Sequence, residues 1–322
     1  MNPILGNTYK FDPSEILEIH SQTDIKEIFF VSEDNEYVSM AILRNNGSVI
    51  TFGDQNSGGD SSSVSTELQS GVVKIFSTDG AFAALKEDGS VITWGDDAKG
   101  GDSSSVASEL QSDVIEIFSN EGAFVALKQD GTAFTWGHPS YGGDQTSLDG
   151  NSVTTQLQSG TIRKVFATDR SFAAILSDCS VISWGDVFIS SELNTDLESG
   201  VIDFFLTSYD GLSRQFVVLK DDNTVIAWDN NGILYESTNI VKVFLGSRIS
   251  YALKENGTLE YWDGDVEYEI SSYEQLQTAN IPVMAIEFNS EASSALLEDG
   301  SVISWGQPFL GGDTSSVATQ LQ

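Results

Sequence analysis

Basic residues, cysteine and histidine are scarce in this chain of 322 residues. Only 15 lysines and arginines stand against 48 aspartates and glutamates, which gives a formal net charge of −33. A negative field of that size repels nucleic acid and anionic membrane surfaces, so we expect no nucleic-acid partner and favour basic protein partners. The single cysteine, Cys179, cannot form an internal disulfide. Two histidines, His20 and His138, offer little for a histidine-based metal or acid–base site.

Long hydrophobic runs are also missing. No window approaches the roughly 18 apolar residues that a membrane span requires, so we expect no membrane insertion. Residues 1–20 lack the basic start and apolar run that would predict a signal peptide. Hydrophobic residues nevertheless make up 40% of the chain, which is enough to form a core and argues against wholesale disorder.

A repeated phrase dominates the sequence. "ALKEDGSVITWG", which begins at Ala84, returns as "ALKQDGTAFTWG" from Ala126 and as "ALLEDGSVISWG" from Ala295. Seven copies, spaced 34 to 48 residues apart, use all six tryptophans, which predicts a repeat architecture. We expect the aromatic residue that ends each copy to be a structural core residue. These residues are Phe52, Trp94, Trp136, Trp184, Trp228, Trp262 and Trp305.

Each copy predicts a β-hairpin preceded by a further strand. The turn is usually Asx-Gly, as in Asp88-Gly89, which favours a type I′ turn with positive φ at both central residues. Two copies carry Asp178-Cys179 and Asp222-Asn223 instead, and Cys179 is expected to be strained or to mark a different turn. The strand before the turn is small and apolar ("FAAL", "FVAL"), which favours the crowded inner strand of a radial fold.

The two ends of the chain predict how the repeat closes. The last copy stops after "GGDTSSVATQLQ", whereas a strand-like segment, "DIKEIFFVS" (Asp24 to Ser32), precedes the first hairpin. We expect this N-terminal strand to complete the last unit and to close a ring, which removes exposed sheet edges. The predicted fold is therefore all-β, a single seven-bladed β-propeller over residues 24–322. Residues 1–23 form an N-terminal extension in which a short helix is expected.

The repeat resembles that of the regulator of chromosome condensation family. The matching signature is an aliphatic residue, a polar pair, Asp-Gly, a short strand and Trp-Gly, repeated over residues 24–322. The resemblance implies a seven-bladed propeller with terminal closure. It does not imply one function, because members include a nucleotide-exchange factor for a small GTPase, a plant ultraviolet receptor and a secreted β-lactamase inhibitor. The non-catalytic inhibitor compares best, although no residue here identifies β-lactamase as a target.

An acidic glycine turn, "GGD", is a weak candidate for a calcium site. In two copies a second carboxylate lies six residues upstream, which gives the pairs Asp54–Asp60 and Asp96–Asp102. Calcium takes about six to eight oxygen ligands, usually including several carboxylates. The third copy carries His138 at the upstream position, so the pair is not maintained. A turn-forming role for these aspartates is the favoured interpretation.

The copies diverge unevenly. Copies seven, one, two and three keep "GGD" and its serine-rich loop, whereas copies four to six lose it and contain six of the nine tyrosines. Tyrosine in an acidic setting is typical of contact surfaces, and drift with tyrosines filling the blades is the alternative. The candidate partner-binding residues are Tyr235, Tyr261, Asp263, Asp265, Tyr268, Glu269 and Tyr273.

Three functions remain open. The first is a non-enzymatic protein-binding or scaffold propeller that acts through the loops of copies four to six. The second is a structural surface component of a virus particle or cell envelope, where the ring contacts neighbouring subunits; low lysine content slightly favours such an exterior setting. The third is a calcium-dependent surface or adhesion module. We expect no catalysis, because no nucleophile motif or carboxylate pair stands out, and no cofactor other than calcium.

Overall fold

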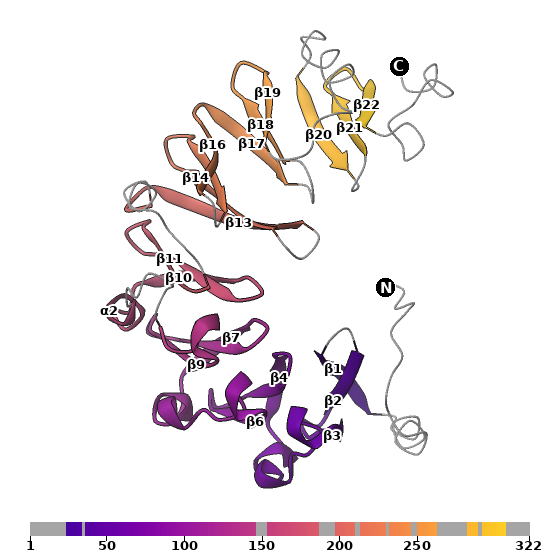
Figure 1. Cartoon of the computed structure of the whole chain (residues 1–322), viewed down its shortest axis with the longest axis vertical. Coiled ribbons are helices and arrows are strands. Elements are labelled where there is room, and N and C mark those ends of the chain that lie inside the picture. Colours follow the sequence, from indigo (N-terminus) through magenta and orange to yellow (C-terminus); the bar gives the residue numbers. More distant parts are fainter. Residues whose placement is uncertain are drawn as a thin grey trace. The chain divides into compact units, whose positions relative to one another are not determined.

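The computed structural model describes residues 24–33, 36–145, 153–186, 197–209, 213–229, 232–245, 250–262, 282–288 and 292–306. Two compact units divide the chain, Met1–Phe188 and Ile189–Gln322. Both are built from antiparallel sheets whose strands follow one another in the sequence, so each sheet carries neighbouring colours in Figure 1. The expected N-terminal extension and its helix lie outside the described residues.

The first unit contains four three-stranded sheets. They are β1 (Ile25–Glu33), β2 (Glu36–Arg44) and β3 (Val49–Gly53); β4 (Val72–Ser77), β5 (Ala81–Lys86) and β6 (Val91–Gly95); β7 (Val114–Ser119), β8 (Ala123–Lys128) and β9 (Ala133–Gly137); β10 (Ile162–Ala167), β11 (Ser171–Leu176) and β12 (Val181–Gly185). Short 3-10 turns follow β3, β6 and β9, and a helical turn, α2 (Thr154–Leu157), precedes β10.

The second unit contains one four-stranded and two three-stranded sheets. They are β13 (Val201–Tyr209), β14 (Ser213–Lys220), β15 (Val225–Asp229) and β16 (Gly232–Ser237); β17 (Ile240–Leu245), β18 (Ser250–Lys254) and β19 (Leu259–Trp262); β20 (Val283–Phe288), β21 (Ala292–Leu297) and β22 (Val302–Gly306). Each sheet is called a blade here and numbered one to seven along the chain. Seven antiparallel blades confirm the predicted all-β propeller class and its hairpin-plus-strand repeat. No helix of the described residues is long and apolar enough to cross a membrane.

The hairpin turns are present, but the type I′ prediction is wrong. Two backbone hydrogen bonds of Lys86 close the turn. Its carbonyl accepts from Gly89 N at 2.9 Å, and its N–H donates to Ser90 O at 2.9 Å. Gly89 has φ +77°, whereas Asp88 does not have a positive φ. This is a type I turn followed by one left-handed residue. The Asp88 carboxylate accepts from Ser90 N at 3.0 Å, so the aspartate is held by its side chain and only the next residue needs positive φ.

Cys179 and Asn223 occupy that same left-handed position. Both have φ +65°, and Cys179 N donates to Leu176 O at 3.0 Å as the glycine does in the other copies. The strain expected at Cys179 is therefore present within an unchanged turn, because a residue with a Cβ pays a steric cost in this region.

The small apolar strand lies in the middle of each sheet, not at its inner edge as predicted. In the second blade all residues from Ala81 to Leu85 are buried, because neighbouring blades pack on both faces of β5. The first strands are the ones that approach each other, since β1 contacts β4 and β4 contacts β7. Small side chains are needed at β5 because both of its faces are covered.

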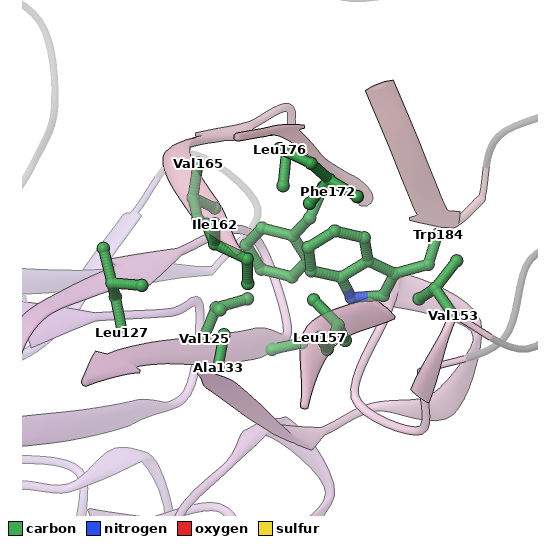
Figure 2. Close-up of a cluster of buried hydrophobic side chains, with 12 residues drawn as sticks. Val125, Leu127, Ala133, Val153, Leu157, Ile162, Val165, Phe172, Leu176 and Trp184 are labelled. Carbon is green, nitrogen blue, oxygen red and sulfur yellow. The ribbon is translucent and has the colours of Figure 1, made fainter. Parts of the chain in front are cut away.

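Hydrophobic clusters between successive blades form the core. One cluster joins the third and fourth blades, where the rings of Phe172 and Trp184 stack with centroids 5.5 Å apart. Figure 2 shows these rings with Val125 from β8 and Leu157 from α2 beside them. Equivalent clusters lie between the first and second and between the second and third blades.

Backbone hydrogen bonds also join successive blades. The turn carbonyl of Gly47 accepts from Val72 N at 3.0 Å, and that of Gly89 accepts from Val114 N at 3.1 Å. A Cβ on Gly89 would lie 2.7 Å from Asp113 N. Glycine is thus needed there both for its positive φ and for the close approach of the next blade.

The N-terminal strand belongs to the first blade. β1 pairs with β2 in the first blade, with Phe29 opposite Ala41, while the last blade forms three strands of its own. The reason is local, since β1 ends at Glu33 and β2 begins at Glu36, so the two strands form a hairpin. Closure of the ring stays a prediction.

Candidate partner-binding surface

The acidic glycine loops use their carboxylates to hold the backbone. Asp54 caps a 3-10 turn by accepting from Asn56 N and Ser57 N at 2.9 and 3.2 Å. Asp60 accepts from Ser62 N at 2.8 Å, and this bond lowers the pKa of the Asp60 carboxyl. Both aspartates therefore act as turn formers in the first copy.

The second copy repeats this geometry. Asp96 accepts from Ala98 N at 2.9 Å and Asp102 accepts from Ser104 N at 2.8 Å. The bond from Ser104 lowers the pKa of Asp102. Across the residues that the structure describes, no three or more acidic, histidine or cysteine side chains gather where they could hold a metal ion. The calcium hypothesis therefore gains no support from these four aspartates.

A glycine of the same loop binds the tryptophan of the next blade, a link that the sequence patterns did not suggest. Trp94 Nε1 donates to Gly58 O at 3.1 Å, and Trp136 Nε1 donates to Gly100 O at 3.1 Å. A Cβ on Gly58 would lie 2.6 Å from the ring of Phe82, so no larger residue fits. The "GGD" loop of one blade and the tryptophan of the next blade therefore pack together and form one contact between the blades.

The tryptophans are buried as a group. Trp94, Trp136, Trp184, Trp228, Trp262 and Trp305 are 0 to 4% exposed. Phe52 is only partly buried, and Met40 lies opposite it, where copies two to five place a phenylalanine opposite the tryptophan. The buried indole nitrogens of Trp228 and Trp262 have no hydrogen-bond partner among the described residues.

Two tyrosines pack on the tryptophans of the last two blades. Tyr251 is fully buried, and its hydroxyl accepts from Trp305 Nε1 at 2.8 Å, as a glycine carbonyl does in the earlier blades. Tyr235 on β16 stacks on Trp262, with ring centroids 4.6 Å apart and an interplanar angle of 14°. Trp262 lacks a phenylalanine partner because Ser250 lies opposite it, and Tyr235 supplies the missing ring.

Of the candidate partner-binding residues, two are described and both are half-buried. Tyr235 packs as above, and Tyr261 packs against the core between the last two blades. These side chains thus have the packing role that was the alternative interpretation for tyrosine in this region. The other candidates lie outside the described residues; they are Asp263, Asp265, Tyr268, Glu269 and Tyr273.

A polar network fixes β16 to the sixth blade. The Tyr235 hydroxyl donates to Glu260 Oε2 at 2.5 Å, and Lys254 Nζ donates to Glu260 Oε1 at 2.8 Å and to Ser237 Oγ at 3.0 Å. Burial of Glu260 opposes its charged form, but the bonds from Lys254 and Tyr235 outweigh it, so the pKa of Glu260 is lowered. β16 is therefore held by side chains as well as by its pairing with β15.

β16 presents apolar residues to solvent. Ile233 and Leu234 are 40% and 39% exposed, and Glu236, two residues after Leu234, is exposed too. Leu234 lies at an irregularity in the pairing, where Ala227 faces Tyr235 and Trp228 faces Ile233. Sequence reasoning missed this strand because "GILYES" does not belong to the three-strand repeat; its only signal was the shortened spacing between Trp228 and Trp262, where the "GGD" loop is lost.

Comparison with known proteins finds similarity in structure only. No protein-family model matches the chain, and no curated protein sequence matches it. The ectodomain of the Physcomitrella patens receptor kinase CR4 has 13% identity and a TM-score of 0.39, over 88% of this chain and 73% of that one. The CRINKLY WD40 ectodomain of the Arabidopsis thaliana receptor kinase ACR4 has 14% identity and a TM-score of 0.38, over 88% of this chain and 95% of that one.

Prp20p from Saccharomyces cerevisiae has 13% identity and a TM-score of 0.38, over 88% of this chain and 82% of that one. The similar structures thus include yeast RCC1 (Prp20), a regulator of the kind that the repeat resembles. Similarity at these levels transfers no function to this chain.

Proposed function

We propose that this chain is a non-enzymatic, protein-binding propeller and that its fifth and sixth blades contact the partner. The observation that carries the proposal is the exposed pair Ile233 and Leu234 on a strand that no other described blade has. Contiguous exposed apolar surface on a firmly held element marks the interaction site in many proteins, and the two residues of this pair are neighbours in the sequence.

The charge of the chain indicates the kind of partner. A net charge of −33 attracts basic surfaces and accelerates association with them, and it disfavours acidic ones. Glu236, two residues after Leu234 on the same strand, is exposed. A partner with basic side chains around an apolar centre would complement this surface.

The test begins with affinity capture of the tagged chain from its native source, followed by reconstitution of the complex from purified proteins. Cross-linking with mass spectrometry then maps the contact. We expect cross-links to residues 197–262, and binding that weakens as salt rises. Cross-links confined to residues 24–186, or recovery only as a stoichiometric component of particles or envelopes, would contradict the proposal.

A further inference from the structure

We propose that the outer edge of β16 pairs with an extended, basic segment of a partner protein, which adds a fifth strand to the fifth blade. This inference rests on the proposed function and names how the partner binds. The chemistry is backbone hydrogen bonding along the strand, with Ile233 and Leu234 as side-chain anchors.

The outer strand in the "GGD" blades is covered by the chain that follows it. After β6, residues 96–113 fold back beside the strand, and Thr93 Oγ1 donates to Gly101 O at 2.9 Å. After β3, Thr51 Oγ1 makes the same bond to Gly59 O at 2.9 Å. These loops keep the outer strands from offering a free edge.

The fifth blade has no such cover from its own connection. β16 ends at Ser237 and β17 begins at Ile240, so only Thr238 and Asn239 join the two strands. That connection is too short to fold back along β16. β16 is the last strand in the order β13-β14-β15-β16, and none of the described strands pairs with its other side. Unpaired backbone groups at such an edge are a template for another strand.

The side chains of β16 do not protect its edge in the usual ways. "GILYES" contains no lysine and no proline, the residues that commonly block edge pairing. Its protection against self-pairing comes from charge, since two copies of a chain with net charge −33 repel each other. An extended segment rich in lysine or arginine meets no such barrier, and this favours a basic partner over a second copy.

The rigid attachment of β16 also favours strand pairing at its edge. The Tyr235–Trp262 stack and the bonds of Glu260 and Lys254 hold β16 in place before a partner arrives. A strand that is already ordered adds no ordering cost of its own on binding.

The probe is a short fluorescent peptide of alternating lysine and valine, titrated against the full chain by anisotropy. Its first control is the same peptide N-methylated at alternate residues, which keeps charge and composition but removes the N–H groups of one edge. Its second control has glutamate in place of lysine. We expect measurable binding of the lysine peptide, at least about tenfold weaker binding of the N-methylated form, and none of the glutamate form.

The matched variants test the location. Ile233→Thr with Leu234→Thr keeps β-propensity but removes the apolar anchors, and should weaken binding about tenfold. Ile202→Thr with Val241→Thr changes residues that are 50% and 53% exposed on β13 and β17, and should leave binding unchanged. Equal melting temperatures for both variants would establish that the fold is retained. Hydrogen exchange should slow at residues 232–237 when the peptide binds.

Several outcomes would overturn the inference. They are absence of binding, equal binding of the N-methylated peptide, equal losses in both double variants, or protection of residues 232–237 by self-association without peptide. If a captured partner still cross-links to residues 197–262 and binds the Ile233/Leu234 variant normally, the edge inference fails while the proposed function stands. If no partner contacts that region, the proposed function fails first.

Discussion

Trp94 Nε1 lies 3.1 Å from the carbonyl oxygen of Gly58, a residue of the preceding blade's loop. This hydrogen bond joins the two most regular features of the sequence, the "GGD" loop and the tryptophan. The same pair recurs between Trp136 and Gly100. In the sixth blade the loop is gone and Trp262 Nε1 has no partner among the described residues. The difference between these blades can be measured.

Replacing Trp94 by phenylalanine should lower the free energy of unfolding by more than the same change at Trp262. Trp94→Phe leaves the Gly58 carbonyl without its donor, which costs about 1–3 kcal/mol beyond the lost packing. Trp262→Phe removes a buried N–H that has no partner within the described part of the chain. Urea denaturation followed by circular dichroism measures both changes; equal losses would show that the indole hydrogen bond is not what the loop provides.

Two turn glycines separate backbone strain from steric contact. Gly89 and Gly257 have φ of +77° and +84°, so alanine at either position pays the left-handed penalty of about 1–2 kcal/mol. Only at Gly89 does the new Cβ meet the next blade, 2.7 Å from Asp113 N, whereas nothing lies within 4 Å at Gly257. We expect Gly89→Ala to be clearly more destabilising in thermal melts, and a smaller effect than that of Gly257→Ala would contradict the contact.

Cys179→Gly should stabilise the protein. Cys179 sits at φ +65°, and glycine removes a left-handed penalty of about 1–2 kcal/mol while adding about 0.5–1 kcal/mol of unfolded-state entropy. The expected net gain is a few tenths to about 1 kcal/mol. Cys179→Ala retains the Cβ and provides the control, since it should give no gain. A melting temperature that rises equally in both variants would point to the thiol instead of the backbone.

Acid should weaken the hairpin turns. The side-chain hydrogen bond from Ser90, followed by the bond from its N–H, lowers the pKa of Asp88, and Asp130, Asp178, Asp222 and Asp299 are lowered in the same way. A carboxyl whose pKa is lower in the folded state contributes stability above its unfolded pKa of about 3.9, and this is lost as pH falls through the folded pKa.

Urea unfolding from about pH 5 down to about pH 2 should therefore show falling stability. Asp88→Asn keeps an acceptor for Ser90 but no longer titrates, so its decline should be shallower than that of the natural chain. Identical slopes would exclude this turn as a source of the acid sensitivity.

Tyr251→Phe should destabilise the last two blades. The Tyr251 hydroxyl accepts from Trp305 Nε1 at 2.8 Å and lies 3.1 Å from Ser293 Oγ, so its removal leaves a buried indole N–H unpaired at a cost of about 1–3 kcal/mol. If hydrogen exchange in the variant becomes faster than in the natural chain at residues 292–306 but not at residues 72–137, the effect lies in the last blade. Unchanged exchange in both ranges would mean that the hydroxyl is not needed.

The repeat predicted the blades well because its signals are local. Asx-Gly turns and alternating strands are readable within one copy, and the seven repeats correspond to the seven sheets. The turn type was missed because Asp88 and Ser90 decide it through a side-chain bond, which the Asx-Gly rule does not consider. The position of the small strand was missed because burial on both faces depends on neighbouring blades.

The candidate surface was less predictable. Tyr235 looked like a contact residue because tyrosine and acid are dense around it, but its ring is needed by Trp262, on the next blade. That need arises from Ser250, which stands opposite Trp262 where copies two to five have phenylalanine. Such compensation involves three residues on different strands, and no spacing in one sequence reveals it. The extra strand that carries Ile233 was missed because its sequence lies outside the repeat.

Leu68 belongs by sequence to the first copy, yet it is buried with Phe82 and Trp94 of the second. The segment that folds as a unit is therefore offset from the segment that repeats. A fragment cut at the start of β4, where the sequence copy begins again, would leave behind both Leu68 and Gly58. A fragment that starts at Asp54 would keep them. Any recombination of these blades, in the laboratory or by duplication of a gene, would preserve the contact between the "GGD" loop and the tryptophan only if its breakpoints fall before that loop.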